Sequence, residues 1–195
     1  MFEVKIDNPD KLFFTSDLHI NHANICKYCH RPFESRSEMM HTLIDNWNSV
    51  VPEDGIVINC GDFMLNHKED LKEYLKYMHK LNGCQYLVRG NHDIISLSTT
   101  PLSEKLLAVQ DLMVIKVEGI KIIASHIPLM TYPADYHVFG HIHTLSDGTC
   151  YGVDGDVNEK LRKTQYDVGV DQNGYKPISY WELVDIFRNK AKNLK

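Results

Sequence analysis

A short, continuous apolar run in the first third of the chain limits the possible folds most strongly. Gly55–Cys60 has the sequence Gly-Ile-Val-Ile-Asn-Cys and follows the turn residues Pro52–Asp54. A strand that is apolar on both faces is typical of a parallel sheet covered on both sides. Helical spacing of apolar residues over Ser35–Val50 and Lys68–Leu81 predicts crossover helices. We therefore expect an α/β fold with parallel strands.

Further strands are expected on both sides of this unit. Phe2–Ile6 and Leu12–Ser16 flank a turn at 8–10 and are predicted to be neighbouring strands, and Gln85–Val88 is predicted to follow the second helix. Leu102–Val109 is expected to form a short helix. The later predictions are a hairpin of Leu112–Val117 and Lys121–Ala124, strands at Tyr136–Phe139 and Tyr166–Val170, a loop over Gly148–Asn158, a helix over Trp181–Asn189 and a frayed tail at Lys190–Lys195.

Length and charge restrict the class of protein. The 195 residues are expected to form one domain, 1–195, with a buried core. With 26 acidic and 21 basic residues, the formal charge of -5 makes a long nucleic acid an unfavourable partner and favours small substrates. Five cysteines, an odd number, are expected to be reduced thiols, and no apolar run reaches the ~18 residues of a membrane span. We expect a cytoplasmic protein; the oligomeric state is not readable.

Polar side chains follow five of the predicted strands, at the point where each strand ends. Ligands collect at the carboxyl ends of strands in open α/β sheets, so these side chains are expected to converge. A single Asp-x-His or His-x-His is a weak signal, but five such elements in succession are hard to ascribe to packing. Seven nitrogen and oxygen ligands without a thiolate suit two divalent ions about 3.5–4 Å apart, with one carboxylate bridging them. The seven are Asp17, His19, Asp62, Asn91, His126, His141 and His143.

This series resembles the calcineurin-like metallophosphoesterase superfamily, and the resemblance runs over most of the chain. Its motifs are Asp17-x-His19, Gly61-Asp62, Gly90-Asn91-His92-Asp93, His126 and Gly140-His141-x-His143. The resemblance implies a four-layer α/β/β/α sandwich, in which two mixed sheets are flanked by helices and the dimetal site lies at the carboxyl ends of strands. It also implies a hydrolase of small, nucleotide-like phosphodiesters that uses a hydroxide held between two metal ions.

The resemblance further implies a role for each site residue. Asp17, His19 and His143 would hold one ion, Asn91, His126 and His141 the other, and Asp62 would bridge them, with His92 as general acid or phosphate clamp. Manganese is the expected activator in vitro, with zinc or iron as alternative occupants in cells. Asp93 would either support His92 or cap the turn.

Two comparisons refine this prediction. Phosphoprotein phosphatases of the superfamily continue Gly-Asp with x-x-Asp-Arg-Gly, whereas Gly61-Asp62 continues as Phe63–Asn66, so a protein phosphatase is not expected. Segments Asp17–Ile25, Arg31–Phe33 and Val168–Asp171 are similar to small bacterial and phage phosphoesterases of the superfamily. A phosphomonoesterase, a nuclease or a non-catalytic metal-binding scaffold would use the same ligands and remain alternatives.

The loop after the first ligands carries the candidate substrate-binding residues His22, Asn24 and Arg31. A guanidinium can grip a phosphate with two hydrogen bonds, so Arg31 is the most informative of the three. The alternative for Arg31 is a surface ion pair or a structural contact that holds the loop against the helix from Ser35. A zinc knuckle formed by His22, Cys26, Cys29 and His30 is a weaker possibility, because no second cysteine pair has finger-like spacing.

Overall fold

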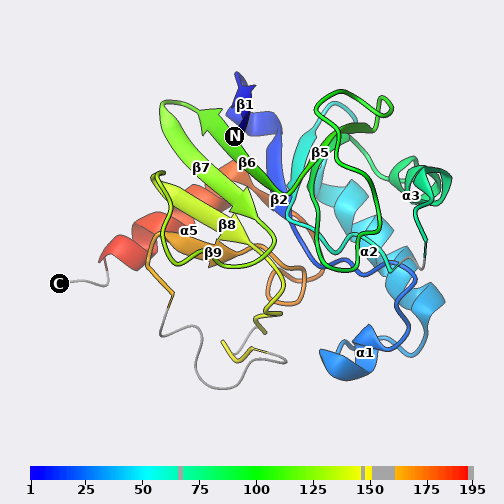
Figure 1. Ribbon diagram of the computed structural model, residues 1–195. Helices are drawn as coiled ribbons and strands as arrows, with labels where there is room; N and C mark the ends of the chain where they lie inside the picture. Colours follow the sequence, from blue (N-terminus) through cyan, green and yellow to red (C-terminus); the bar gives the residue numbers. More distant parts are fainter. Residues whose placement is uncertain (66–67, 146–147, 151–160, 193–195) are drawn as a thin grey trace.

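Two five-stranded mixed sheets form the centre of the molecule in a computed structural model (Figure 1). The structure describes residues 1–65, 68–145, 148–150 and 161–192. Helices flank the sheets, as the predicted α/β/β/α sandwich requires. No helix within the described ranges is long and apolar enough to cross a membrane.

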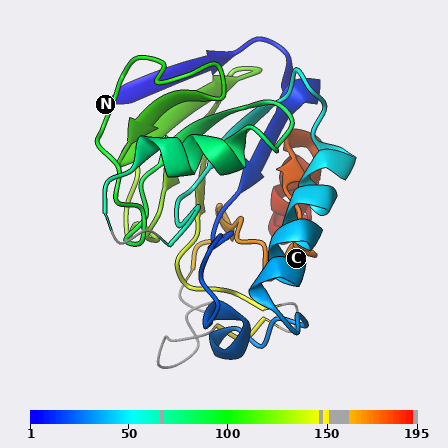
Figure 2. The same ribbon diagram turned by 90° about the vertical axis from the view of Figure 1, so that its right-hand side faces the viewer.

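The first sheet contains the parallel unit that the sequence predicts. Its strand order is β10-β2-β3-β4-β5, with β2–β5 parallel and β10 antiparallel to β2. The strands are β2 (Leu12–Thr15), β3 (Ile56–Asn59), β4 (Cys84–Val88), β5 (Leu106–Gln110) and β10 (Ile178–Ser179). Helices α2 (Arg36–Val50) and α3 (Leu71–Met78) connect the parallel strands and lie on one face of this sheet (Figure 2).

The second sheet contains the predicted hairpin. Its order is β1-β6-β7-β8-β9, and only the β6–β7 pair is antiparallel. Glu118 and Gly119 connect the hairpin and both have positive φ, which matches the right-handed twist of the two strands. The strands are β1 (Phe2–Ile6), β6 (Leu112–Val117), β7 (Ile120–Ser125), β8 (Tyr136–Phe139) and β9 (Gln165–Asp167).

Alternating side chains divide the interior into two cores. Phe13 and Val57 face α2 and α3, whereas their neighbours Phe14 and Ile58 face the second sheet. The core between the sheets also takes in residues of α5 (Tyr180–Lys192), whose Phe187 stacks on a tyrosine of β8. The apolar run of β3 is therefore buried on both faces, as predicted.

Side-chain caps explain where the two crossover helices begin. The Ser35 hydroxyl accepts a hydrogen bond from the backbone N–H of Glu38, and the Asp70 carboxylate accepts one from that of Glu73. With Asp70 as N-cap, α3 begins at Leu71, three residues after the predicted Lys68. A short helix, α1 (Ile25–Tyr28), and a 3-10 turn, η1 (Pro9–Lys11), complete the N-terminal part.

Two predictions about secondary structure are wrong. Phe2–Ile6 and Leu12–Ser16 are not neighbours, because η1 lets the chain cross from one sheet to the other, and β1 pairs with β6 instead. Leu102–Val109 does not form a helix, because pairing with β4 holds Leu106–Gln110 as a strand whose Leu106 and Ala108 are fully buried.

The predicted C-terminal elements agree in part. Strand β9 ends at Asp167, and α5 begins at Tyr180 and ends at Lys192, beyond the predicted Asn189. Most of the predicted loop Gly148–Asn158 and the last three residues of the predicted tail lie outside the described residues.

Candidate metal centre

The carboxyl ends of five strands bring the predicted ligands together. Asp17 and His19 follow β2, Asp62 follows β3, Asn91 and His92 follow β4, His126 follows β7, and His141 and His143 follow β8. Backbone hydrogen bonds join the segments after β2 and β3: the N–H groups of Asp17 and His19 donate to the carbonyls of Gly61 and Asp62, both at 2.9 Å. The first two ligand-bearing loops are therefore held side by side.

One group of possible ligands is formed by Asp17, His19 and His143. All three are buried, and their ligating atoms lie within 4.8 Å of one another. Nε2 of His19 is 3.2 Å from Nε2 of His143. Two imidazole nitrogens and a carboxylate thus converge on a small volume from two different sheets.

A second group lies beside the first. Oδ1 of Asn91 is 2.9 Å from both Nε2 of His126 and Nδ1 of His141. Asp62 joins the two histidines, with ligating atoms again within 4.8 Å of one another. This group contains one amide oxygen, one carboxylate and two imidazoles.

Asp62 lies between the two groups. Its Oδ2 is 3.5 Å from Nε2 of His19 in the first group and 3.4 Å from Nε2 of His126 in the second. Its other oxygen accepts a hydrogen bond from the backbone N–H of His92 at 2.9 Å. One carboxylate oxygen is therefore anchored while the other faces both groups.

The backbone at the site is strained. Asp17, His19, Asp62, His141 and His143 all have φ between 47° and 72°, the left-handed region that non-glycine residues seldom adopt. Such conformations cost of order 1–3 kcal/mol each and concentrate at functional sites. These backbone conformations direct five side chains to one place. Packing of the hydrophobic core does not require them.

Two glycines allow the backbone to approach the carboxylates closely. A Cβ at Gly90 would collide with Oδ1 and the backbone nitrogen of Asp62, and one at Gly140 would collide with Ser16 and Oδ2 of Asp17. Any larger residue would push a carboxylate out of place. These glycines belong to the Gly-Asn-His-Asp and Gly-His-x-His motifs, whose spacing thus has a steric reason.

Hydrogen bonds at the outer ring nitrogens orient two of the histidines. Nδ1 of His126 donates to the carbonyl of Cys60 at 2.8 Å, and Nδ1 of His143 donates to Oδ2 of Asp171 at 2.8 Å. Each bond leaves Nε2 facing the site. A carboxylate behind a histidine is a common arrangement around metal ligands, because it selects the tautomer and raises the basicity of the ring.

The buried carboxylates of the site create a negative electrostatic potential at the neighbouring histidines. Burial alone would lower the pKa of His143, but the carboxylates of Asp17 and Asp171 outweigh burial and raise that pKa to about 11. Burial likewise opposes charge on His126, yet Asp62 and Asp17 raise its pKa to about 9. The same negative potential favours a divalent cation in place of these protons.

His19 behaves differently. Burial lowers its pKa well below the ordinary value, and the positive charges of His143 and Arg31 add to the effect. Its Nδ1 is buried without a hydrogen-bond partner among the described residues. The other ring nitrogen, Nε2, lies 3.5 Å from Oδ2 of Asp62. A buried neutral imidazole with a nitrogen beside a carboxylate fits a metal ligand, so the donor set suits two divalent ions.

His92 lies at the accessible side of the site. Its side chain is 34% exposed, and its Nε2 is 3.9 Å from Oδ2 of Asp62. The ring of His22 contacts that of His92, with centroids 5.5 Å apart. His22 is therefore where a substrate-binding residue is expected, whereas Asn24 is exposed at the start of α1 and forms no side-chain cap there.

Asp93 caps the turn and does not support His92. Its carboxylate accepts hydrogen bonds from the backbone N–H groups of Gly90 and Phe63, at 2.9 and 3.0 Å, and from the hydroxyl of Tyr74 at 3.1 Å. Of the two roles that the sequence leaves open for Asp93, the structure favours the structural one.

The structure does not support the prediction that Arg31 grips substrate. Its side chain is fully buried, with Nε 2.7 Å from Oδ1 of Asp171, and its other nitrogens donate to the carbonyls of Leu18 and Asp17 and to the carboxylate of Asp171. The fifth donor faces the sulfur of Met39. No N–H group is left for a phosphate. Arg31 forms an ion pair, but the pair is buried with Asp171 and does not lie on the surface, as the alternative expected.

The zinc knuckle is also not formed. Among the described residues, no group of ligating atoms unites His22, Cys26, Cys29 and His30. Cys26 instead faces the sulfur of Met39, and Cys29 lies beside His143 and Asp171. Both thiols therefore pack against side chains behind the candidate metal centre.

Asp171 is the functional residue that the sequence does not reveal. It lies 28 residues after His143 and 140 after Arg31, and it binds both. The similarity of Val168–Asp171 to small phosphoesterases of the superfamily marks the segment but not these two contacts. The other sequence signal is an acidic residue directly after the predicted strand Tyr166–Val170.

Residues 11–126, more than half of the chain, match the calcineurin-like phosphoesterase family. The chain belongs to this family. The family resemblance that the motifs carry is thereby confirmed.

Two relatives of this calcineurin-like phosphoesterase are similar to it over most of its length. The uncharacterized protein MJ1445 of Methanocaldococcus jannaschii is 34% identical over 172 residues, which cover 87% of this chain and 86% of the relative. The crystal structure of a protein of unknown function, AQ665 from Aquifex aeolicus, is 26% identical with a TM-score of 0.66 and covers 90% of this chain and 98% of that one.

Proposed function

We propose that the protein is a dimetal phosphodiesterase that hydrolyses small, nucleotide-like phosphodiesters. The observation that carries the proposal is the position of Asp62, whose Oδ2 faces a histidine of each ligand group, with His92 within 4 Å on the accessible side. Membership of the calcineurin-like phosphoesterase family supports the reaction class.

The ligand groups indicate how the ions would be held. Asp17, His19 and His143 would hold one ion, and Asn91, His126 and His141 the other, with Asp62 shared between them. Two such ions supply a nucleophile at neutral pH and neutralise charge on the phosphate. Asp171 and the carbonyl of Cys60 keep Nε2 of His143 and His126 turned inward.

His92 would protonate the leaving oxygen. Its backbone N–H is bound to Asp62, which holds the residue beside the shared carboxylate, and its ring is open to a substrate. His22 contacts this ring and would lie next to the scissile group of a bound substrate. General acid catalysis of this kind contributes typically 10²–10⁴-fold, most for poor leaving groups.

Two observations support this substrate class: the net charge of the chain, and the presence of all seven candidate ligands together with His92. A formal charge of -5 disfavours a long nucleic acid, and the site retains every ligand and His92, which a mere scaffold does not need. Assays of the protein loaded with manganese, zinc or iron against a chromogenic phosphodiester, a monoester and cyclic and linear nucleotides test the proposal. We expect the diesters to be hydrolysed fastest and excess chelator to abolish activity; exclusive monoester hydrolysis would contradict the proposal.

Two variants separate metal binding from acid catalysis. Asp62→Ala should lose metal and activity together, whereas His92→Ala should retain both ions and lose roughly 10²–10⁴-fold in rate on poor leaving groups. His41→Ala, an exposed histidine on α2, serves as control and should change neither. Loss of metal in the His92 variant would show that His92 is a ligand.

A further inference from the structure

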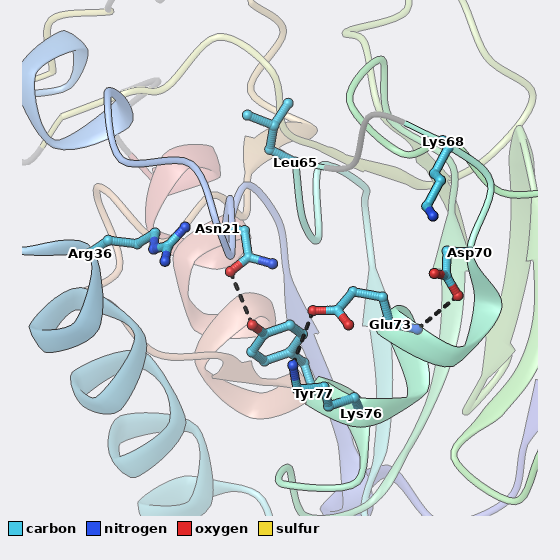
Figure 3. A pocket seen from close by; sticks show the side chains of 8 residues that line it. All are labelled: Asn21, Arg36, Leu65, Lys68, Asp70, Glu73, Lys76 and Tyr77. Carbon is cyan, nitrogen blue, oxygen red and sulfur yellow. Dashed lines mark hydrogen bonds and ion pairs between the residues drawn. The ribbon is translucent and has the colours of Figure 1, made fainter.

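A cavity of about 510 Å³ opens between α2, α3 and the segments that follow the first ligands in the chain (Figure 3). Asn21 and Leu65 form its wall on the side of those segments. Arg36 at the start of α2 and Lys68 ahead of α3 lie on either side of it, and Tyr77 closes one wall.

Two residues that line the cavity lie close in the chain to candidate metal ligands. Asn21 lies two residues after His19, so their Cα atoms are at most about 7.6 Å apart, and Leu65 lies three residues after Asp62. The N–H of Leu65 donates to the carbonyl of Ile20 at 2.8 Å, which joins the two segments at the cavity. The segments that carry His19 and Asp62 therefore continue directly into the wall of the cavity.

Three cations line the cavity, and two of them, Arg36 and Lys68, lack a carboxylate partner among the described residues, whereas the two carboxylates that line it are engaged. The Glu73 carboxylate pairs with Lys76 at 3.3 Å, and Asp70 caps α3. Within the described ranges, neither Arg36 nor Lys68 has a carboxylate oxygen within 4 Å of its charged nitrogens. In Figure 3 both side chains extend toward the cavity from opposite sides.

Asn21 adds a neutral donor. The hydroxyl of Tyr77 donates to Oδ1 of Asn21 at 3.0 Å, which fixes the orientation of the amide and leaves its NH₂ group to act as donor. Asn21 has a φ of 68°, so the backbone is strained at this wall as it is at the metal ligands. Tyr77 itself is buried and fixed in place, as a positioning residue requires.

We propose that this cavity binds a second phosphate group of the substrate, held by Arg36, Lys68 and Asn21 while the scissile diester lies at the metal centre. The inference rests on the proposed phosphodiesterase function and narrows it to diesters that carry an additional terminal phosphate. A guanidinium, an ammonium and an amide supply complementary donors for the phosphate oxygens. The chain as a whole has a net charge of -5, so Arg36 and Lys68 form a local positive region. Such a region attracts a dianionic phosphate more strongly than a neutral group.

The test compares two substrates that differ only in the second phosphate: a dinucleotide with a 5′-terminal phosphate and the same dinucleotide without it. The wild type should have the higher kcat/KM for the phosphorylated one. Arg36→Gln and Lys68→Gln should each reduce that preference about tenfold, through KM, and leave kcat/KM for the unphosphorylated dinucleotide unchanged. Lys72→Gln, an exposed lysine of α3 outside the cavity, is the matched control and should keep the preference.

A binding measurement separates this proposal from the catalytic one. Calorimetric titration of the metal-free protein with inorganic pyrophosphate should show binding that both cavity variants weaken and Lys72→Gln does not. If the wild type hydrolyses both dinucleotides equally, or if the cavity variants alter neither preference nor pyrophosphate binding, the second-phosphate site is refuted while the phosphodiesterase function stands. If no diester is hydrolysed but pyrophosphate binding depends on Arg36 and Lys68, the cavity is an anion site and the proposed function is refuted instead.

Discussion

Oδ2 of Asp171 accepts a hydrogen bond from Nδ1 of His143 at 2.8 Å. The other oxygen of the same carboxylate binds the guanidinium of Arg31, and both side chains of that ion pair are almost wholly buried. The charge of Arg31 holds the pKa of Asp171 below its usual value despite burial. A buried ion pair thus fixes the ring of His143, a candidate metal ligand, from behind.

Asp171→Asn removes the charge that orients and polarises His143. We expect the affinity for the ion held by that histidine to fall 10–100-fold. The affinity for the other ion should fall less. Competitive titration with manganese against a chelating dye measures both affinities. Asp185→Asn, an exposed carboxylate on α5, is the control, and unchanged affinities in Asp171→Asn would show that the pair is purely structural.

Arg31→Met leaves the Asp171 carboxylate buried without its partner. Breaking a buried ion pair in this way costs about 3–5 kcal/mol, so the free energy of unfolding should fall by that amount in urea denaturation. Arg188→Met removes an exposed pair and should cost less than about 1 kcal/mol. A stable Arg31→Met protein with a raised KM would restore the substrate-binding role.

Gly90→Ala tests the close contact between the Gly-Asn-His-Asp motif and Asp62. The added Cβ would collide with the carboxylate and backbone nitrogen of Asp62, so we expect both ions to bind more weakly and activity to fall with metal content. Gly119→Ala, whose Cβ would meet nothing within 4 Å, should cost about 1 kcal/mol of stability through its positive φ and leave metal binding intact. Full metal occupancy in Gly90→Ala would contradict the steric argument.

His137 makes stability depend on pH independently of the metal centre. Burial lowers the pKa of this fully buried ring, which lies between Ser125 and Gln165, to about 4. A histidine in an unfolded chain has a pKa of about 6.5, so the unfolded state binds more protons between these values. The stability that neutral His137 contributes is present above pH 6.5 and is lost as the pH falls toward 4.

The loss between pH 7 and pH 5 should be about 2 kcal/mol. Urea denaturation of the metal-free protein at the two pH values measures it, and His137→Gln should lessen the decrease by that amount. His41→Gln, an exposed histidine, should leave the decrease unchanged. Equal pH dependence in the wild type and His137→Gln would contradict the role of this buried ring.

Local sequence determined the identity of the site residues. Asp17, Asp62, Asn91, His126 and His141 each follow a short apolar strand, and the ends of neighbouring strands meet at one edge. The residues that meet there can therefore be recognised one strand at a time, without knowledge of the pairing. The parallel unit around β3 could be predicted for the same reason, because its apolar runs and helical spacing are local properties.

Only the tertiary structure decided which distant residues support the site. Arg31 and Asp171 are 140 residues apart, and their ion pair depends on how two loops pack, which no local pattern records. The separation of β1 from β2 and the strand at Leu106–Gln110 were likewise decided by hydrogen bonding to available sheet edges. Hydrogen bonding at the sheet edge outweighed the local helical preference of Leu106–Gln110. Arg31, of a residue type that usually lies on the surface, is buried here because it pairs with the carboxylate that orients His143.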